Sequence, residues 1–110
     1  MTDVCLTCRQ DGRILSCSAQ GHSEYAPAGS DIVCAAVTIL LRTTLQVLLE
    51  YCPAAVDADL SERGRMFFCV KEEVGNDVPL VYAADFLRSG LKSLCKEYPR
   101  HIAFREEIKD

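Results

Sequence analysis

The sequence lacks an excess of basic residues, a phosphate-binding glycine loop and an uninterrupted apolar run of membrane-spanning length. Lysine and arginine number 12 against 16 aspartates and glutamates, a net charge of −4, whereas nucleic-acid binding calls for a basic face. The longest apolar stretch, residues 32–49, is interrupted by Arg42, Thr43, Thr44 and Gln46, which argues against a membrane span. We therefore expect neither direct nucleic-acid binding nor membrane insertion.

Signals for secretion and for metal binding are also missing. The chain starts Met1-Thr2-Asp3, with an acid where a signal peptide carries basic residues, and no signal-like apolar segment follows. Cys5 and Cys8 have metal-site spacing, but there is no second pair and no histidine at a zinc-like interval. The cysteines number seven, an odd count, so we expect reduced thiols, a cytoplasmic location and neither metal nor cofactor.

Along the chain, segments whose apolar residues recur every second position alternate with segments whose apolar residues recur every three to four positions. A length of 110 residues without repeats or linkers predicts one domain, residues 1–110. Period two predicts strands at 4–9, 14–19, 56–60, 66–70 and 102–104, the first two joined at Asp11-Gly12. Helical spacing predicts helices at 31–51 and about 77–98. We therefore expect a two-layer α+β domain, with two helices on a mixed or antiparallel sheet of about five strands.

Three expectations concern individual elements. The strand at 66–70 is apolar on both faces, which is typical of a central strand. The charged end, residues 105–110, predicts a frayed tail. The helix at 31–51 is apolar nearly all round and must be covered on more than one side, which a second copy of the chain would achieve.

Residues 21–34 place a histidine loop just before a cysteine in the first turn of the predicted helix. Gly21-His22 precedes a loop interrupted by proline and glycine, and Ser30 or Asp31 can cap the helix that holds Cys34. A free thiol is only about 3% ionised at neutral pH, and a helix N-terminus or a neighbouring imidazolium lowers a cysteine pKa to roughly 3.5 to 7.5. This arrangement predicts a nucleophilic Cys34 beside a general base, His22.

Residues 21–38 read Gly-His-Ser-Glu-Tyr-Ala-Pro-Ala-Gly-Ser-Asp-Ile-Val-Cys-Ala-Ala-Val-Thr. They resemble the signature of the ribosomal-processing cysteine protease Prp family, with the match strongest at Gly21, His22, Gly29 and residues 31–35. The resemblance implies a cysteine endopeptidase with Cys34 as nucleophile and His22 as base. It also implies a homodimer and a substrate, the large-subunit ribosomal protein number twenty-seven, whose N-terminal leader is removed during ribosome maturation.

The supporting residues have two interpretations each. Asp31 either caps the helix or orients His22. Thr38, four residues after Cys34, hydrogen-bonds either the thiol or its own helix backbone. Gly21 and Gly29 either permit unusual backbone angles or act as hinges for a substrate loop that includes Tyr25, Gly29 and Ser30. An amide near Gly21 or Cys34 could contribute to an oxyanion hole.

Two functions of other classes remain open at this point. In one, the chain is a non-catalytic ribosome-associated assembly or binding module in which Cys34 is buried and inert. In the other, it is a redox protein that uses Cys5 and Cys8.

Overall fold

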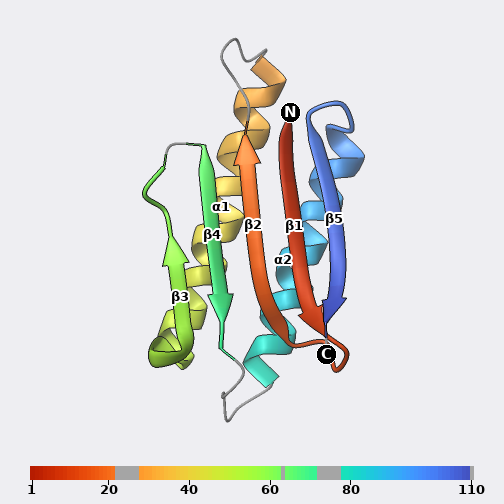
Figure 1. Cartoon of the computed structure of the whole chain (residues 1–110). Helices are drawn as coiled ribbons and strands as arrows, with labels where there is room; N and C mark the ends of the chain where they lie inside the picture. The colour runs from red at the N-terminus through yellow and green to blue at the C-terminus, as the bar shows by residue number, and fades with distance from the viewer. Residues whose placement is uncertain (22–27, 63, 72–77, 110) are drawn as a thin grey trace.

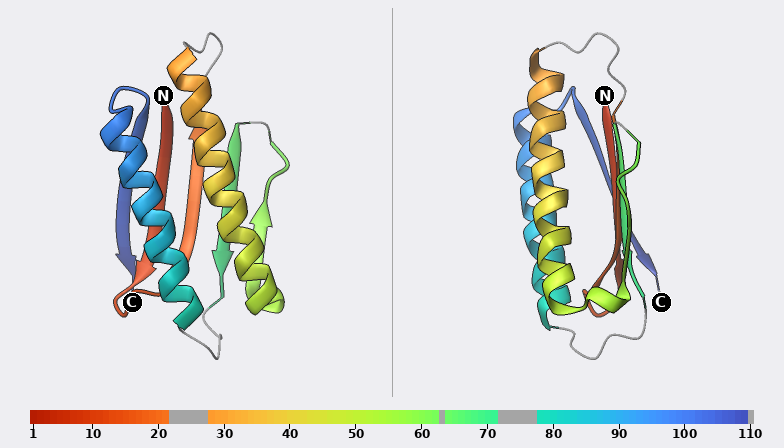
Figure 2. Two further views of the ribbon diagram at one scale, coloured as in Figure 1. Left: turned by 180° about the vertical axis from the view of Figure 1, so that it is seen from behind. Right: turned by 90° about the vertical axis from the view of Figure 1, so that its left-hand side faces the viewer.

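The computed structural model describes residues 1–21, 28–62, 64–71 and 78–109, with the backbone alone for residues 28–31. Two helices cover one face of a five-stranded sheet, and the other face carries no helix (Figures 1 and 2). The elements in chain order are β1 (Thr2–Arg9), β2 (Ile14–Gly21), α1 (Ala28–Tyr51), a 3-10 turn (Pro53–Ala55), β3 (Val56–Asp59), β4 (Arg65–Val70), α2 (Val78–Glu97) and β5 (Ile102–Lys109). The predicted α+β class and element order are confirmed.

The sheet is mixed and has the strand order β3-β4-β2-β1-β5. β1 and β2 form the predicted antiparallel hairpin, and Gly12 in the connecting turn has a φ of 95°, which glycine adopts without strain. β4 pairs antiparallel with β2 and β3, whereas β5 pairs parallel with β1. This topology brings the start of β1, the end of β2 and the start of β4 to one end of the sheet (Figure 1).

The core lies between the sheet and the helices. Alternate residues of β1 face the helices, and the buried side of each helix repeats every three to four residues. The fully buried larger side chains are Leu6, Ile14, Cys17, Val33, Leu41, Leu48, Phe68, Leu87 and Leu91. This packing fixes the position of α1 relative to the strands.

Two sequence predictions about strands are wrong. β4 is an interior strand but not the central one, and Phe67 on its uncovered face is 38% exposed. Residues 105–109 are not a frayed tail, because β5 continues to Lys109 and pairs with β1 as far as Arg9. Backbone pairing with β1 orders this edge strand, and its charged side chains suit an edge that faces water.

α1 combines a buried side with an exposed apolar side. Its residues Ile32–Tyr51 are long and apolar enough to cross a membrane by length and composition, yet in this fold the buried side packs on the sheet. Ile39 and Tyr51 are 62% and 64% exposed. The apolar side left outside the core agrees with the prediction that this helix is too apolar for one layer of cover.

Candidate active site

Cys34 is half-buried on α1, in the second helical turn. The helix begins at Ala28, three residues earlier than predicted, so Cys34 is its seventh residue and does not lie in its first turn. The free amides at a helix N-terminus belong to the first turn, and the effect of the helix dipole declines within that turn. The helix terminus therefore activates this thiol less than the sequence suggested, and its other neighbours matter more.

The sulfur of Cys34 lies against the ends of β1 and β2. Thr2 Oγ1 is 3.2 Å from Cys34 Sγ, a side-chain hydrogen bond between strand and helix. Gly21 pairs with Thr2 across the hairpin, and a Cβ added to Gly21 would lie 3.3 Å from the same sulfur. The sulfur is thus held where the chain leaves β2 toward His22, which itself lies outside the described residues.

Gly21 provides space for the sulfur, and the prediction that it adopts an unusual backbone angle is wrong. In the described part of the chain, the glycines with positive φ are Gly12 and Gly64. The Gly21 amide donates to the Gly64 carbonyl over 2.8 Å, and the amide of Cys34 is committed to the helix. These two amides are therefore already bonded, and an oxyanion hole formed by another amide near Gly21 or Cys34 stays a prediction.

The residues predicted to support the dyad are placed differently from one another. Thr38 Oγ1 donates to the Cys34 carbonyl over 2.7 Å, which confirms the backbone alternative. Asp31 lies inside the first turn of α1, so it is not the N-cap, although its charge still suits that end of the helix. Gly29 and Ser30 also lie in this first turn and not in a loop. Tyr25 lies outside the described residues.

Cys34 lines a pocket of about 230 Å³ at the end of the sheet. Its wall is apolar at Ala19, Val37, Leu60 and Met66, and its charged lining residues are Arg42, Glu62 and Arg65. The pocket can therefore accept an apolar side chain next to the sulfur. Two arginines against one glutamate also favour a negative charge there.

Four other cysteines are less suited to nucleophilic chemistry. Burial raises the pKa of Cys17 to about 12, and burial also raises the pKa values of Cys8, Cys52 and Cys95. Cys8 belongs to the core, whereas Cys5 lines the uncovered face of the sheet. Because these two side chains point to opposite faces of β1, the redox alternative that joins them is wrong.

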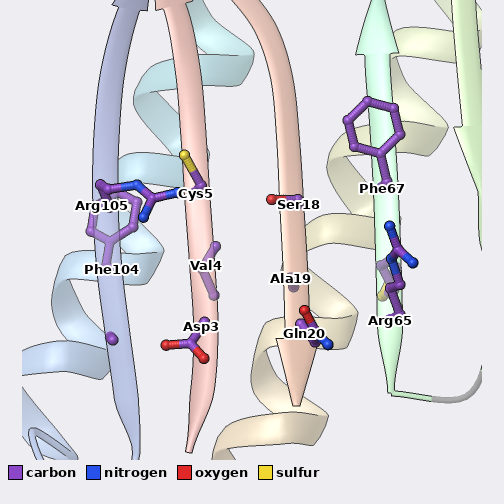
Figure 3. Close-up of a pocket in the computed structure, with 12 residues that line it drawn as sticks. Asp3, Val4, Cys5, Ser18, Ala19, Gln20, Arg65, Phe67, Phe104 and Arg105 are labelled. Carbon is purple, nitrogen blue, oxygen red and sulfur yellow. The ribbon is translucent and has the colours of Figure 1, made fainter.

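A larger hollow of about 470 Å³ lies on the face of the sheet opposite the helices (Figure 3). Figure 3 shows Cys5, Ser18 and Arg105 beside it, and no histidine is among its described lining residues. Within the described ranges, no group of three histidine, cysteine or acidic side chains could hold a metal ion. The chemistry therefore favours the smaller pocket at Cys34 over the larger hollow.

The chain is similar to known proteins over nearly its whole length. The family model described as cysteine protease Prp matches residues 1–103. The chain belongs to the Prp cysteine protease family. The ribosomal processing cysteine protease Prp of Staphylococcus aureus (strain Mu50 / ATCC 700699) is 24% identical over 102 residues, which cover 93% of this chain and 95% of that protein.

Solved structures share the Prp fold. The crystal structure of SMU.848 from Streptococcus mutans has a TM-score of 0.80 at 21% identity, covering 99% of this chain and 96% of that one. The essential ribosomal processing protease Prp from S. aureus, in complex with a substrate peptide, has a TM-score of 0.79 at 20% identity and covers 97% of this chain and all of that one.

The sequence reading missed two residues of the site, Thr2 and Gly64. Thr2 lies an even number of residues before Val4 and Leu6, so it faces the same side of β1 as these inward-facing residues. The Asp11-Gly12 turn sets it opposite Gly21. That register could have placed its hydroxyl near the helix. The bond of Gly64 to Gly21 depends on how β4 pairs with β2, which no local pattern specifies.

Proposed function

We propose that this chain is a cysteine endopeptidase with Cys34 as nucleophile and His22 as general base. One observation carries the proposal: the sulfur of Cys34 lies beside Gly21, the residue that precedes His22, and Cys34 lines a pocket. The place of His22 in the sequence, directly after Gly21, is therefore what supports its role as the base for this thiol. Asp31 is placed in the first turn of α1, from which its carboxylate could orient His22.

The reaction follows from these roles. The Cys34 thiolate attacks the scissile carbonyl carbon, and the tetrahedral intermediate collapses to a thioester as His22 gives its proton to the leaving amine. A water molecule, deprotonated by His22, then attacks the thioester and releases the carboxylate and the thiol. The thiolate and imidazolium titrate as a coupled pair, so both set the pH dependence of the rate.

The substrate we propose is the N-terminal leader of a large-subunit ribosomal protein, number twenty-seven. The S. aureus relative was crystallised with a substrate peptide and with a covalently linked product peptide. In this chain the apolar wall of the Cys34 pocket suits an apolar leader residue next to the cleaved bond. We place the enzyme in the cytoplasm, where ribosomal proteins are made, and treat residues 1–110 as one catalytic domain. Tyr25 would contact the leader.

Selective alkylation and peptide cleavage test the proposal. At pH 6.5, iodoacetamide should label Cys34 faster than the other six cysteines, with Cys17 last because burial raises its pKa to about 12. His22→Ala should slow this labelling, and both Cys34→Ala and His22→Ala should abolish cleavage of the host's leader-bearing ribosomal protein. Labelling is followed by peptide mass spectrometry, and cleavage by the mass of the products.

His101→Ala is the matched control for His22, since His101 precedes β5 and does not line the Cys34 pocket. It should label and cleave like the wild type. Uniform labelling together with an intact ribosomal protein would favour the binding module and end the protease proposal. Cleavage of other proteins but not of this ribosomal protein would reject the proposed substrate and retain the proposed cysteine protease mechanism.

We further propose that the protein is a homodimer. The sides of α1 and α2 that face away from the sheet expose Val47, Tyr51, Val78, Tyr82 and Phe86, which we call the outer helical face. These side chains surround an apolar hollow of about 380 Å³ between the two helices. Exposed apolar patches of this kind mark interaction surfaces, and a two-fold axis lets one face cover its own copy.

A further inference from the structure

We propose that Thr2 is a positioning residue for the Cys34 nucleophile. Its hydroxyl is 3.2 Å from Cys34 Sγ, close enough to donate to the thiolate. This inference rests on the proposed function, because it gives Cys34 the role of nucleophile. The inference adds the side chain of Thr2, which belongs to the sheet, to the proposed thiol and imidazole of the active site.

Thr2 is fixed in place by the strands on either side of it. It pairs with Gly21 of β2 and with Ile102 of β5, and its amide donates to the His101 carbonyl over 3.0 Å. The side chain is only 4% exposed, which leaves little solvent to satisfy its hydroxyl. A buried hydroxyl needs a hydrogen-bond partner, and in this structure that partner is the sulfur.

Thr38 does not compete for the sulfur. Its hydroxyl donates to the Cys34 carbonyl. Cys34 also lies beyond the first turn of α1, where the helix dipole has weakened. Among the described side chains, Thr2 is therefore the one hydrogen-bonded to this sulfur, and its hydroxyl is the donor once the thiol is ionised.

The bond favours the reactive form of the thiol and fixes its direction. A hydroxyl that donates to a thiolate stabilises the charged state, and a fixed partner selects the rotamer that points the sulfur toward Gly21 and the pocket. The other described charged groups that line this pocket are Arg42 of α1, Glu62 before β4 and Arg65 of β4. His101, whose carbonyl accepts from the Thr2 amide, does not line it. These groups remain unchanged when the hydroxyl alone is removed.

Replacing the hydroxyl by a methyl group tests the proposal. Thr2→Val keeps the shape of the side chain and should move the midpoint of the pH profile for Cys34 alkylation upward by about one unit, with labelling at pH 6.5 slowed about fivefold to tenfold. Thr2→Ser retains the donor and should restore the wild-type midpoint. Thr2→Ala replaces Thr2→Val if the latter does not fold.

Thr44→Val is the matched control. Thr44 is a buried threonine of the same helix as Cys34, and its hydroxyl donates to the Leu40 carbonyl. Its pH profile should match the wild type. An unchanged midpoint in Thr2→Val, or an equal shift in Thr44→Val, would overturn the role of Thr2.

The alkylation profile and the cleavage assay separate this inference from the proposed function. A shifted midpoint in Thr2→Val, in a protein that cleaves no peptide, would support the bond and reject the protease. Normal cleavage with an unshifted midpoint would support the protease and reject the bond.

Discussion

At the scale of single residues, the site depends on small side chains that let a sulfur approach the sheet. Cys34 comes from α1. Among the described residues, Thr2 is hydrogen-bonded to its sulfur and Gly21 leaves space beside it, both at the ends of strands. Gly21 contributes by having no Cβ, and its amide is held by Gly64. A side chain at position 21 would therefore displace the Cys34 sulfur and change the stability of the fold much less.

Gly21→Ala should reduce activity more than stability. The added Cβ would lie 3.3 Å from Cys34 Sγ, so the sulfur must shift by a few tenths of an ångström. The backbone at Gly21 is not left-handed, so alanine introduces no backbone strain. We expect a loss of cleavage rate of about tenfold or more, since small misplacements of reacting groups are costly, with a change in unfolding free energy of about 1 kcal/mol or less.

Steady-state kinetics and urea unfolding of the same preparation measure both quantities. Gly12→Ala serves as the contrast, because Gly12 has a φ of 95° and lies at the far end of β1. It should destabilise the fold while the folded fraction keeps its activity. A Gly21→Ala enzyme with normal rates would show that the sulfur has room to spare.

At the scale of elements, the close approach of α2 to α1 sets where α1 lies on the sheet. Gly90 of α2 lies against Leu40, and a Cβ built there would be 2.8 Å from Leu40 Cδ2. Glycine in the middle of a helix costs about 1 kcal/mol relative to alanine. The helix tolerates this cost because the absent side chain allows the two helices to touch.

Gly90→Val should destabilise the protein by about 1–2 kcal/mol. Overpacking at a tight contact costs about 1–3 kcal/mol, and the better helix propensity of valine returns only part of that. Ser89→Val is the control, because Ser89 is exposed on the same helix. Urea unfolding compares the two variants. Equal stabilities would mean that Leu40 moves aside freely and that the helix contact is not tight.

At the scale of the whole molecule, the two layers leave two very different surfaces. The uncovered face of the sheet carries polar and charged side chains such as Asp3, Ser18 and Arg105 (Figure 3). The outer helical face is apolar, with Tyr82 68% and Phe86 52% exposed. The proposed dimer covers the second surface and leaves the Cys34 pocket, at the end of the sheet, open to a peptide.

Charges on the outer helical face should separate the proposed dimer. The wild type should sediment at twice the chain mass of 12.2 kDa, and the double variant Tyr82→Lys with Phe86→Lys should sediment as a monomer, because a buried unpaired charge is costly. Phe67→Lys places the same charge on the uncovered sheet face, at a residue 38% exposed, and should remain dimeric. Sedimentation velocity distinguishes these states. Sedimentation of the wild type as a monomer would reject the proposed homodimer.

The pattern of the sequence was enough to predict the order of the helices and strands, whereas the role of Cys34 as nucleophile stays a prediction. Alternation along β1 and the Asp11-Gly12 turn predicted the hairpin, and helical spacing predicted α2, because both signals are local. The start of α1 was placed too late. Nothing local to Ala28 marks it as helical, whereas Ser30 and Asp31 are residues that often cap helices.

Local pattern by itself determined that this is an α+β chain with a helix that carries Cys34. Only the tertiary structure decided what surrounds that cysteine. Thr2 and Gly21 meet Cys34 because strand pairing and helix packing bring together residues 32 positions apart, or 13 in the case of Gly21. The parallel pairing of β5 with β1 likewise ordered a charged end that its composition predicted to fray. Such contacts depend on register and packing between elements, which periodicity within one element does not specify.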